Sequence, residues 1–166
     1  MLLRLAPGRA GDAGVRNDSV VSWPVLAAIA SEAFAIINEV WVGEAAAFEA
    51  RVRALARDHG RDARALVALD DDRAVIGVAL FTPSRVSGSL YELSWLAVAP
   101  SRRRCGVGRA LVAAAIASAR ALRGGLVFAT ETPAFYERCG CGTPSRITEN
   151  RWVFVIGCSN VIGKQP

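Results

Sequence analysis

The sequence has few of the side chains from which metal sites and nucleophilic catalytic sites are built. Among 166 residues it has one histidine, His59, and four cysteines, none of them in a C-x-x-C pair. Structural zinc sites use closely spaced cysteines and histidines, and a catalytic cysteine needs a base such as histidine beside it. His59 stands at the end of a predicted helix, where a surface cap is expected. The sequence therefore predicts neither a metal site nor a cysteine/histidine nucleophile.

Long apolar runs and blocks of basic residues are missing as well. The most apolar segment, residues 25–37, is too short to span a bilayer and contains Glu32, and the N-terminus lacks the apolar core of a secretory signal. The formal net charge is +5, but the arginines are spread along the chain and are not interleaved with aromatics. We expect a cytoplasmic protein without a membrane segment or a dedicated nucleic-acid surface. The sequence leaves a homodimer open.

The composition and length of the chain are those of one folded domain. Hydrophobic residues make up 52% and charged residues 21% of the sequence, which is typical of a globular protein. A chain of this length buries a sizeable core without help from disulfides or metals. We therefore expect residues 1–166 to form a single domain.

Periodicity predicts a mixed fold of strands and helices. A polar turn at residues 70–73 joins two apolar runs as a hairpin, and a third strand follows in antiparallel order. A strand, a helix and a strand then form a crossover, which makes those two strands parallel at the middle of the sheet. The predicted class is α/β (α+β), with a largely antiparallel sheet, a central parallel pair and flanking helices. Strands are expected at 2–5, 65–69, 74–81, 90–98, 126–130 and 151–156, and helices at 20–34, 45–58, 107–122 and 133–138.

The loop between the strand at 90–98 and the following helix has the composition of an anion site. Gly106 and Gly108 allow a sharp turn that presents backbone N–H groups at a helix N-terminus, and Arg102, Arg103, Arg104 and Arg109 add positive charge. The P-loop motif is absent, and the third glycine and later acidic residue of a dinucleotide-binding fold are absent too. A ligand with several phosphates is favoured, while nucleotide hydrolysis and hydride transfer are not.

The pattern Arg103-x-x-Gly106-x-Gly108 after Trp95-Leu-Ala-Val-Ala-Pro resembles the coenzyme A pyrophosphate loop of the GNAT acyltransferases. The later Phe135-Tyr-Glu-Arg-Cys-Gly is similar to the F-Y-E-x-x-G-F segment of that family, and the order of elements agrees. The resemblance covers roughly residues 66–140. Pro133 and Cys141 depart from the family's usual asparagine and phenylalanine.

The resemblance implies an N-acetyltransferase that uses acetyl-CoA, with a cofactor-binding core at about 65–157 and acceptor-side helices at about 20–60. It implies that Leu96 and Val98, with Ala97 between them, meet the pantetheine arm through their backbone. It also implies that the loop and first helical turn cradle the pyrophosphate. The implied residues there are Arg103, Arg104, Cys105, Gly106, Val107, Gly108, Arg109 and Ala110.

Glu92 is the candidate general base, because aminolysis of a thioester needs a group that takes the proton of the ammonium ion. Burial on a central strand would raise its proton affinity towards that task. It also matches the base glutamate of some members of the family, although a surface or ion-paired glutamate is the alternative. Strict alternation would place Glu92 and Ser94 on one face of the strand and the apolar residues on the other, namely Tyr91, Leu93, Trp95 and Ala97.

Tyr136 is the candidate acid, since it matches the tyrosine that often protonates the coenzyme A thiolate in the family; the alternative is a core aromatic. Cys105 has no histidine partner, so direct transfer in a ternary complex is expected and not an acyl-cysteine. The acceptor is an amine of a small molecule or a peptide. Glu32, Glu39 and Glu44 could attract it or be ordinary helix-surface charges. The alternatives are a non-catalytic acyl-CoA sensor and a basic nucleic-acid-binding module.

Overall fold

A computed structural model describes the backbone of residues 2–5, 15–18, 23–44, 46–50, 64–85 and 87–157, and the side chains of residues 31–44, 46–50, 65–85 and 87–157. Two sequence expectations lie outside these residues: residues 51–58 of the helix expected at 45–58, and the surface position of His59. Within the described ranges, no helix has both the length and the apolar character needed to cross a membrane.

The strands form one mixed sheet in the order β2-β1-β3-β4-β5-β6-β8-β7. The expected antiparallel run β3-β4-β5 and the parallel pair β5-β6 are both confirmed. A second parallel pair, β1 with β3, adds the N-terminal hairpin to the sheet. The strands are β1 (Leu2–Leu5), β2 (Val15–Asp18), β3 (Arg64–Leu69), β4 (Val75–Pro83), β5 (Leu90–Val98), β6 (Gly125–Thr130), β7 (Ser145–Thr148) and β8 (Arg151–Ile156).

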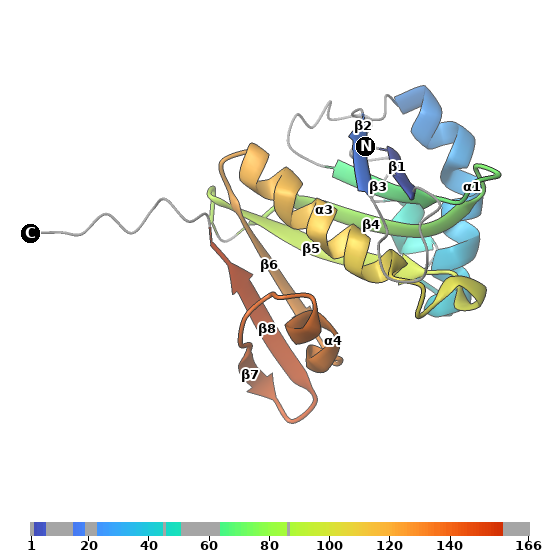
Figure 1. The fold of residues 1–166 in the computed structure, drawn as a ribbon. Helices are drawn as coiled ribbons and strands as arrows, with labels where there is room; N and C mark the ends of the chain where they lie inside the picture. Colours follow the sequence, from blue (N-terminus) through green and yellow to red (C-terminus); the bar gives the residue numbers. More distant parts are fainter. Residues whose placement is uncertain are drawn as a thin grey trace, which may run out of the picture.

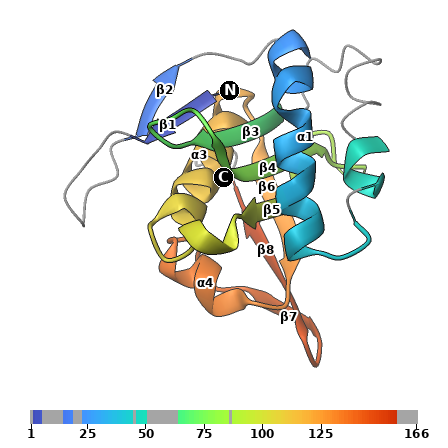
Figure 2. The same ribbon diagram turned by 90° about the vertical axis from the view of Figure 1, so that its right-hand side faces the viewer.

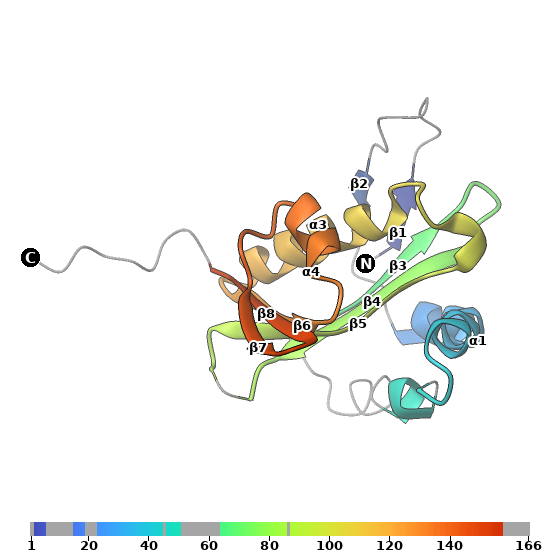
Figure 3. The same cartoon turned by 90° about the horizontal axis from the view of Figure 1, so that it is seen from below.

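Helices cover both faces of the sheet, as Figures 2 and 3 show. Helix α1 (Trp23–Val40) lies on one face, where it packs on β4 and β5. Helix α3 (Val107–Ala121) and the short α4 (Pro133–Arg138) lie on the other. Residues 46–50 are helical too. Two apolar cores result, one under α3 and one under α1. Helix α1 ends six residues later than the sequence predicts, because Ile36 and Ile37 continue its buried face.

Two strands were not expected from the sequence, β2 and β7. Both are four residues long and polar, with the sequences Val-Arg-Asn-Asp and Ser-Arg-Ile-Thr, and both lie at an edge of the sheet. Every side chain of β7 is exposed. An edge strand of this kind has no buried face, so it has no hydrophobic alternation from which it could be recognised.

Strand β5 carries a bulge that the sequence analysis missed. Its pairing with β4 steps from Trp95 opposite Leu80 to Leu93 opposite Phe81, which leaves Ser94 as an extra residue. The expected strict alternation is therefore wrong. Before the bulge, Tyr91 and Leu93 pack in the core under α3, and after it Trp95 and Ala97 pack in the core under α1.

Close contact between α3 and β4 fixes the start of α3. A Cβ atom at Gly77 of β4 would lie 3.0 Å from side-chain atoms of Val107 and Leu111, the residues that α3 places on the sheet at its first turns. Such contacts are tighter than most packed side chains make, so the absence of a side chain at Gly77 lets the helix approach closely. The helix begins at Val107, directly after the arginine-rich loop. The loop therefore lies at the end of β5.

Candidate functional site

Strands β5 and β6 run side by side only at their first residues and then diverge, as Figure 1 shows. Their parallel pairs extend from Leu90 with Gly125 to Glu92 with Val127. Beyond this point β5 continues to pair with β4, and β6 continues to pair with β8. We call this place the fork: residues 90–92 and 125–127 form its base, and residues 93–98 and 128–130 form its arms. No described strand pairs with residues 93–98 on the side that faces β6. The backbone N–H and C=O groups on that side could therefore form hydrogen bonds with a ligand.

Glu92 lies at the base of the fork, in register with Thr82 of β4 and Val127 of β6. It points away from Tyr91 and Leu93, and therefore to the face of the sheet on which α1 lies. Its side chain is exposed, so the burial expected from the sequence is wrong. Helix α1 packs on β4 and β5, and among the described helices none packs closely on this face of β6. The carboxylate is thus open to an incoming molecule.

Two left-handed residues turn the chain between β5 and α3. Arg104 has a φ of 62° and Gly106 a φ of 82°. Gly106 is the N-cap of α3, and its carbonyl oxygen accepts the first helical hydrogen bond, from the N–H of Ala110 at 3.0 Å. The N–H groups of the first helical turn have no partner within the helix, and the helix dipole adds positive potential there. These features favour an anion at the start of α3, and its binding there stays a prediction.

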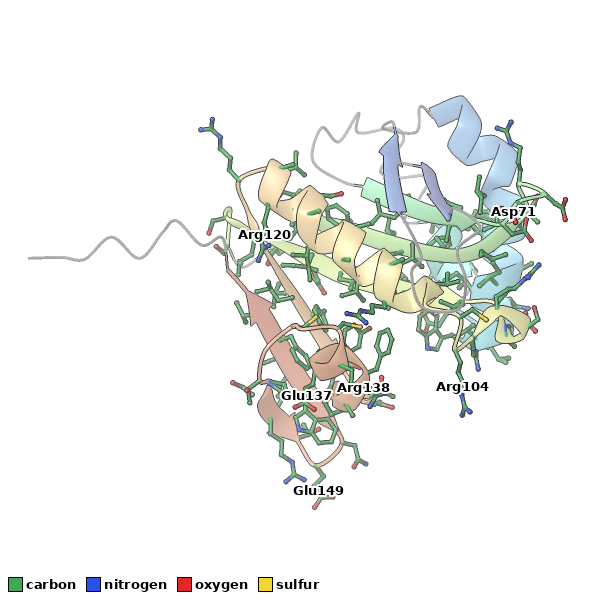
Figure 4. All side chains as sticks on the ribbon, viewed as in Figure 1. Asp71, Arg104, Arg120, Glu137, Arg138 and Glu149 are labelled. Carbon is green, nitrogen blue, oxygen red and sulfur yellow. The ribbon has the colours of Figure 1, made fainter. Side chains whose placement is uncertain are left out.

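The arginines of the loop fall into two groups. The Arg102 guanidinium forms an ion pair with Asp70 of the β3–β4 turn, with 2.9 Å between Nη2 and Oδ2, and so ties the loop to that turn. Arg103 Nε donates a hydrogen bond of 3.4 Å to the carbonyl oxygen of Val98, at the end of one fork arm. Arg104 projects outward, as Figure 4 shows, and Arg109 is also exposed. Of the four, Arg102 alone forms an ion pair with a described residue, so the positive charge of the other three is available to an anion.

Helix α4 follows the other arm of the fork and returns against the start of α3. A Cβ atom at Gly108 would lie 3.1 Å from Cζ of Phe135 and 3.6 Å from Cγ2 of Val98. Arg109 lies near enough to Cys139 to lower the pKa of that thiol, although burial raises it by more. The sequence analysis used Phe135 only as part of the segment that resembles the family motif, and it missed the contact of this ring with the start of α3.

Tyr136 is a core aromatic at its ring and a surface group at its hydroxyl. The residue is 9% exposed, and its ring packs on Phe128 and Phe135, with centroids 4.4 Å and 4.8 Å away. The hydroxyl makes no hydrogen bond with the described residues, and no fully buried polar side-chain atom among them lacks a partner, so its oxygen meets the surface. Burial, reinforced by Cys141 and Cys139, raises the pKa of Tyr136 to about 12. The hydroxyl therefore stays protonated at neutral pH.

The remaining residues predicted to bind the cofactor are brought together, but mostly by their backbone. Leu96 and Val98 turn their side chains to the core under α3, and Ala97 turns its side chain to the core under α1. Val107 and Ala110 belong to the first turn of α3, and both are buried. Exposed Cys105 lies with its Sγ 3.4 Å from the carbonyl oxygen of Arg103. Contacts of these residues with a cofactor would thus be made by main-chain atoms.

The face of the sheet on which α1 lies is acidic, in contrast to the arginine-rich loop. Residues 31–50 contain four glutamates and no basic residue. Glu32 accepts a hydrogen bond of 2.8 Å from the N–H of Val75, so it fastens α1 to β4. Glu39 and Glu44 are exposed. Within the part of the chain that is described, no group of three or more histidine, cysteine, aspartate or glutamate side chains could hold a metal ion.

Comparison with protein families gives one match. The model described as the acetyltransferase (GNAT) family matches residues 26–141, from within α1 to just after α4. No curated protein matches the chain in sequence. The family match spans more than two thirds of the chain and includes the fork, the loop and α4.

Solved structures share the fold. A protein assigned to the GNAT acetyltransferases from Desulfovibrio desulfuricans is 23% identical with a TM-score of 0.66, over 78% of this chain and 92% of that chain. A GNAT family acetyltransferase from Brucella melitensis, solved in complex with acetyl-CoA, is 23% identical with a TM-score of 0.64, over 84% of this chain and 86% of that chain. An aminoglycoside 6'-acetyltransferase type Ii is 17% identical with a TM-score of 0.61, over 80% and 91%.

Proposed function

The chain belongs to the GNAT family of acetyltransferases, and we propose that it moves the acetyl group of acetyl-CoA to a primary amine by direct transfer in a ternary complex. The observation that carries this proposal is the fork, which joins an anion-binding loop, a carboxylate and a protonated tyrosine around one pair of diverging strands. A structural neighbour binds acetyl-CoA, and another is an aminoglycoside acetyltransferase. The first supports the cofactor, and the second supports an amine as the group that is acetylated.

Acetyl-CoA would be held at two places. Its pyrophosphate would lie against the N–H groups that follow Gly106, with Arg103, Arg104 and Arg109 around it. Its pantetheine arm would add main-chain hydrogen bonds along residues 93–98, where β5 has left β6. Such an arm acts as a short strand, so its recognition depends on backbone geometry and tolerates varied side chains.

Glu92 would act as the general base. An aliphatic amine is charged at neutral pH and becomes a nucleophile only when it loses a proton. The carboxylate stands on the face of the sheet opposite α3 and α4, at the point where the strands separate. It could take the proton directly or through water, because its exposed side chain is solvated.

Tyr136 would stabilise the departing thiolate. Among the described residues its hydroxyl has no hydrogen-bond partner, and it carries its proton at neutral pH. A pKa of about 12 exceeds that of an ordinary thiol by about 3.5 units, so complete proton transfer would cost about 5 kcal/mol. The tyrosine should therefore donate a hydrogen bond to the thiolate and share its proton only in part.

A thermal-shift titration with acetyl-CoA, followed by thiol release in the presence of an amine panel, tests the proposal. A ligand that binds only the native state raises the melting temperature by mass action. An unchanged melting temperature at millimolar cofactor would remove the proposed activity. Binding without turnover of any amine would indicate an acyl-CoA sensor. Binding to DNA that falls steeply with salt would indicate a nucleic-acid module.

A further inference from the structure

Three side chains form a row across the face of the sheet on which α1 lies. Glu92 is in register with Val127, and Val127 is in register with Val155. Paired residues of neighbouring strands project on the same side of a sheet. The residues next to them confirm the assignment, because they all pack in the core under α3, namely Tyr91, Leu126 and Ile156.

This row belongs to a larger apolar surface. The side chain of Val155 is 61% exposed, although valine is usually buried. Val127 and Val153 are half-buried, and Ala129, in register with Val153, is exposed. We call these four residues the apolar strip. By register, the charged residue on this side of β6 and β8 is Arg151, at one end of the strip, and Glu92 of the neighbouring β5 lies at the other end.

The apolar strip is continuous with the fork. Helices α3 and α4 occupy the opposite face of the sheet, together with the N–H groups that would bind the pyrophosphate (Figure 3). A cofactor that approaches from that side leaves the Glu92 face to the second substrate. Among the described helices, α1 packs on β4 and β5 of this face and α3 packs on β6 from the other face. The strip therefore begins where the acceptor amine would react.

We propose that the acceptor is a primary amine carried on an apolar chain or ring, with its ammonium group at Glu92 and its body along the apolar strip. This inference rests on the proposed acetyl transfer. Neighbouring strands lie about 4.8 Å apart, so Val155 is about 10 Å from Glu92, within reach of a hexyl chain. A second ammonium group in the same acceptor would rest on valine side chains without a counter-charge, which disfavours polycationic acceptors.

A series of n-alkylamines from propylamine to octylamine tests the inference through kcat/KM, measured by thiol release. Burial of one methylene group is worth about 0.8 kcal/mol, or about a fourfold gain in kcat/KM for each carbon that reaches the strip. The gain should stop when the chain passes Val155. Hexylamine should also exceed 1,6-diaminohexane by at least about tenfold, since the latter adds only a charge at the far end.

The substitution Val155→Glu should reverse that preference. It places a carboxylate about 10 Å from Glu92, where the second ammonium group of 1,6-diaminohexane would lie. We expect hexylamine to lose roughly tenfold in kcat/KM and the diamine to gain, while propylamine changes less than about twofold. Ile147→Glu is the matched control, because Ile147 is 56% exposed on β7 and lies outside the strip.

Each outcome decides a different claim. A flat alkylamine series with measurable acetylation would overturn the inference and leave the proposed function intact. No acetylation of any amine would overturn both. A fall that is equal for all amines in Val155→Glu, together with a change of mass in light scattering, would show that the strip is an interface between copies, and would also overturn the inference.

Discussion

The two regions that flank the later part of β5 are opposite in charge and are built in different ways. Residues 93–130 contain six arginines and no acidic residue, whereas residues 31–50 contain four glutamates and no basic residue. The first region takes its shape from local features, the left-handed Arg104 and Gly106 and the N-terminus of α3. The second is held by contacts between distant residues, such as Glu32 with Val75 and Phe48 with Trp95. The proposed anion site is thus encoded within one short segment, while the proposed acceptor side is assembled from several.

Gly108→Asp should break the first region and give the largest effect. The new side chain would meet Phe135, 3.1 Å from the position of its Cβ, and would put a negative charge where the pyrophosphate is proposed to bind. An acidic residue does not weaken the N-terminus of a helix, so the fold should persist. Affinity for acetyl-CoA should fall by about 100-fold or more, measured by thermal shift. Gly108→Ala is the neutral control, and retained binding in Gly108→Asp would place the cofactor elsewhere.

Glu92→Gln tests the residue that stands between the two regions. Loss of the base should lower turnover at neutral pH by roughly 100-fold, with unchanged affinity for acetyl-CoA. Glu131→Gln, at an exposed position just after β6, is the control. Wild-type turnover in Glu92→Gln at saturating substrate would remove Glu92 from the mechanism.

Tyr136→Phe should give a smaller loss on the cofactor side. The ring and its packing remain, so stability and cofactor affinity should hold while turnover falls by roughly tenfold. The raised pKa of about 12 keeps the hydroxyl protonated in alkaline solution. The ratio of wild-type to variant turnover should therefore stay constant from about pH 7 to about pH 10. An equal loss of cofactor binding would indicate a structural tyrosine.

The double substitution Glu39→Gln, Glu44→Gln should give the smallest effect. It tests how strongly the acidic region attracts a cationic amine through its electrostatic potential. Both side chains are exposed, so their attraction for a cationic amine is screened by salt. We expect kcat/KM to fall about two- to threefold at low ionic strength and not at all at high ionic strength. Glu137→Gln, on α4, is the control. A salt-independent loss would show direct contact with the acceptor.

Much of the fold could be predicted, because most of its elements have their own sequence signal. Helix α3 and strands β3 to β6 carry clear apolar periodicity and are bounded by glycine-rich or polar turns. The short edge strands β2 and β7 carry none. The bulge at Ser94 was also hidden, since an extra residue inside an apolar strand changes which faces are buried without changing the composition.

The site could be predicted where chemistry is local and not where it depends on packing. The loop from Arg103 to Gly108 has the expected conformation, because glycines and a helix start determine it. The exposure of Glu92 depends on where α1 packs, and the use of Glu32 by Val75 depends on residues 43 positions apart. The ligand contacts, the single-domain assignment and the cytoplasmic location stay predictions.

The extra residue in β5 shifts the phase of the strand by one position. Odd-numbered residues of β5 face the core under α3 before Ser94 and the core under α1 after it. The strand therefore supplies both cores from one uninterrupted sequence. Deletion of Ser94 would restore the period of two and leave Trp95 and Leu96 in their present layers, whereas deletion of the regularly paired Ala97 would exchange the layer reached by Val98. Both layers are packed, so neither could accept the exchange without strain. Changes of length in β5 are therefore tolerable only in steps that preserve this phase.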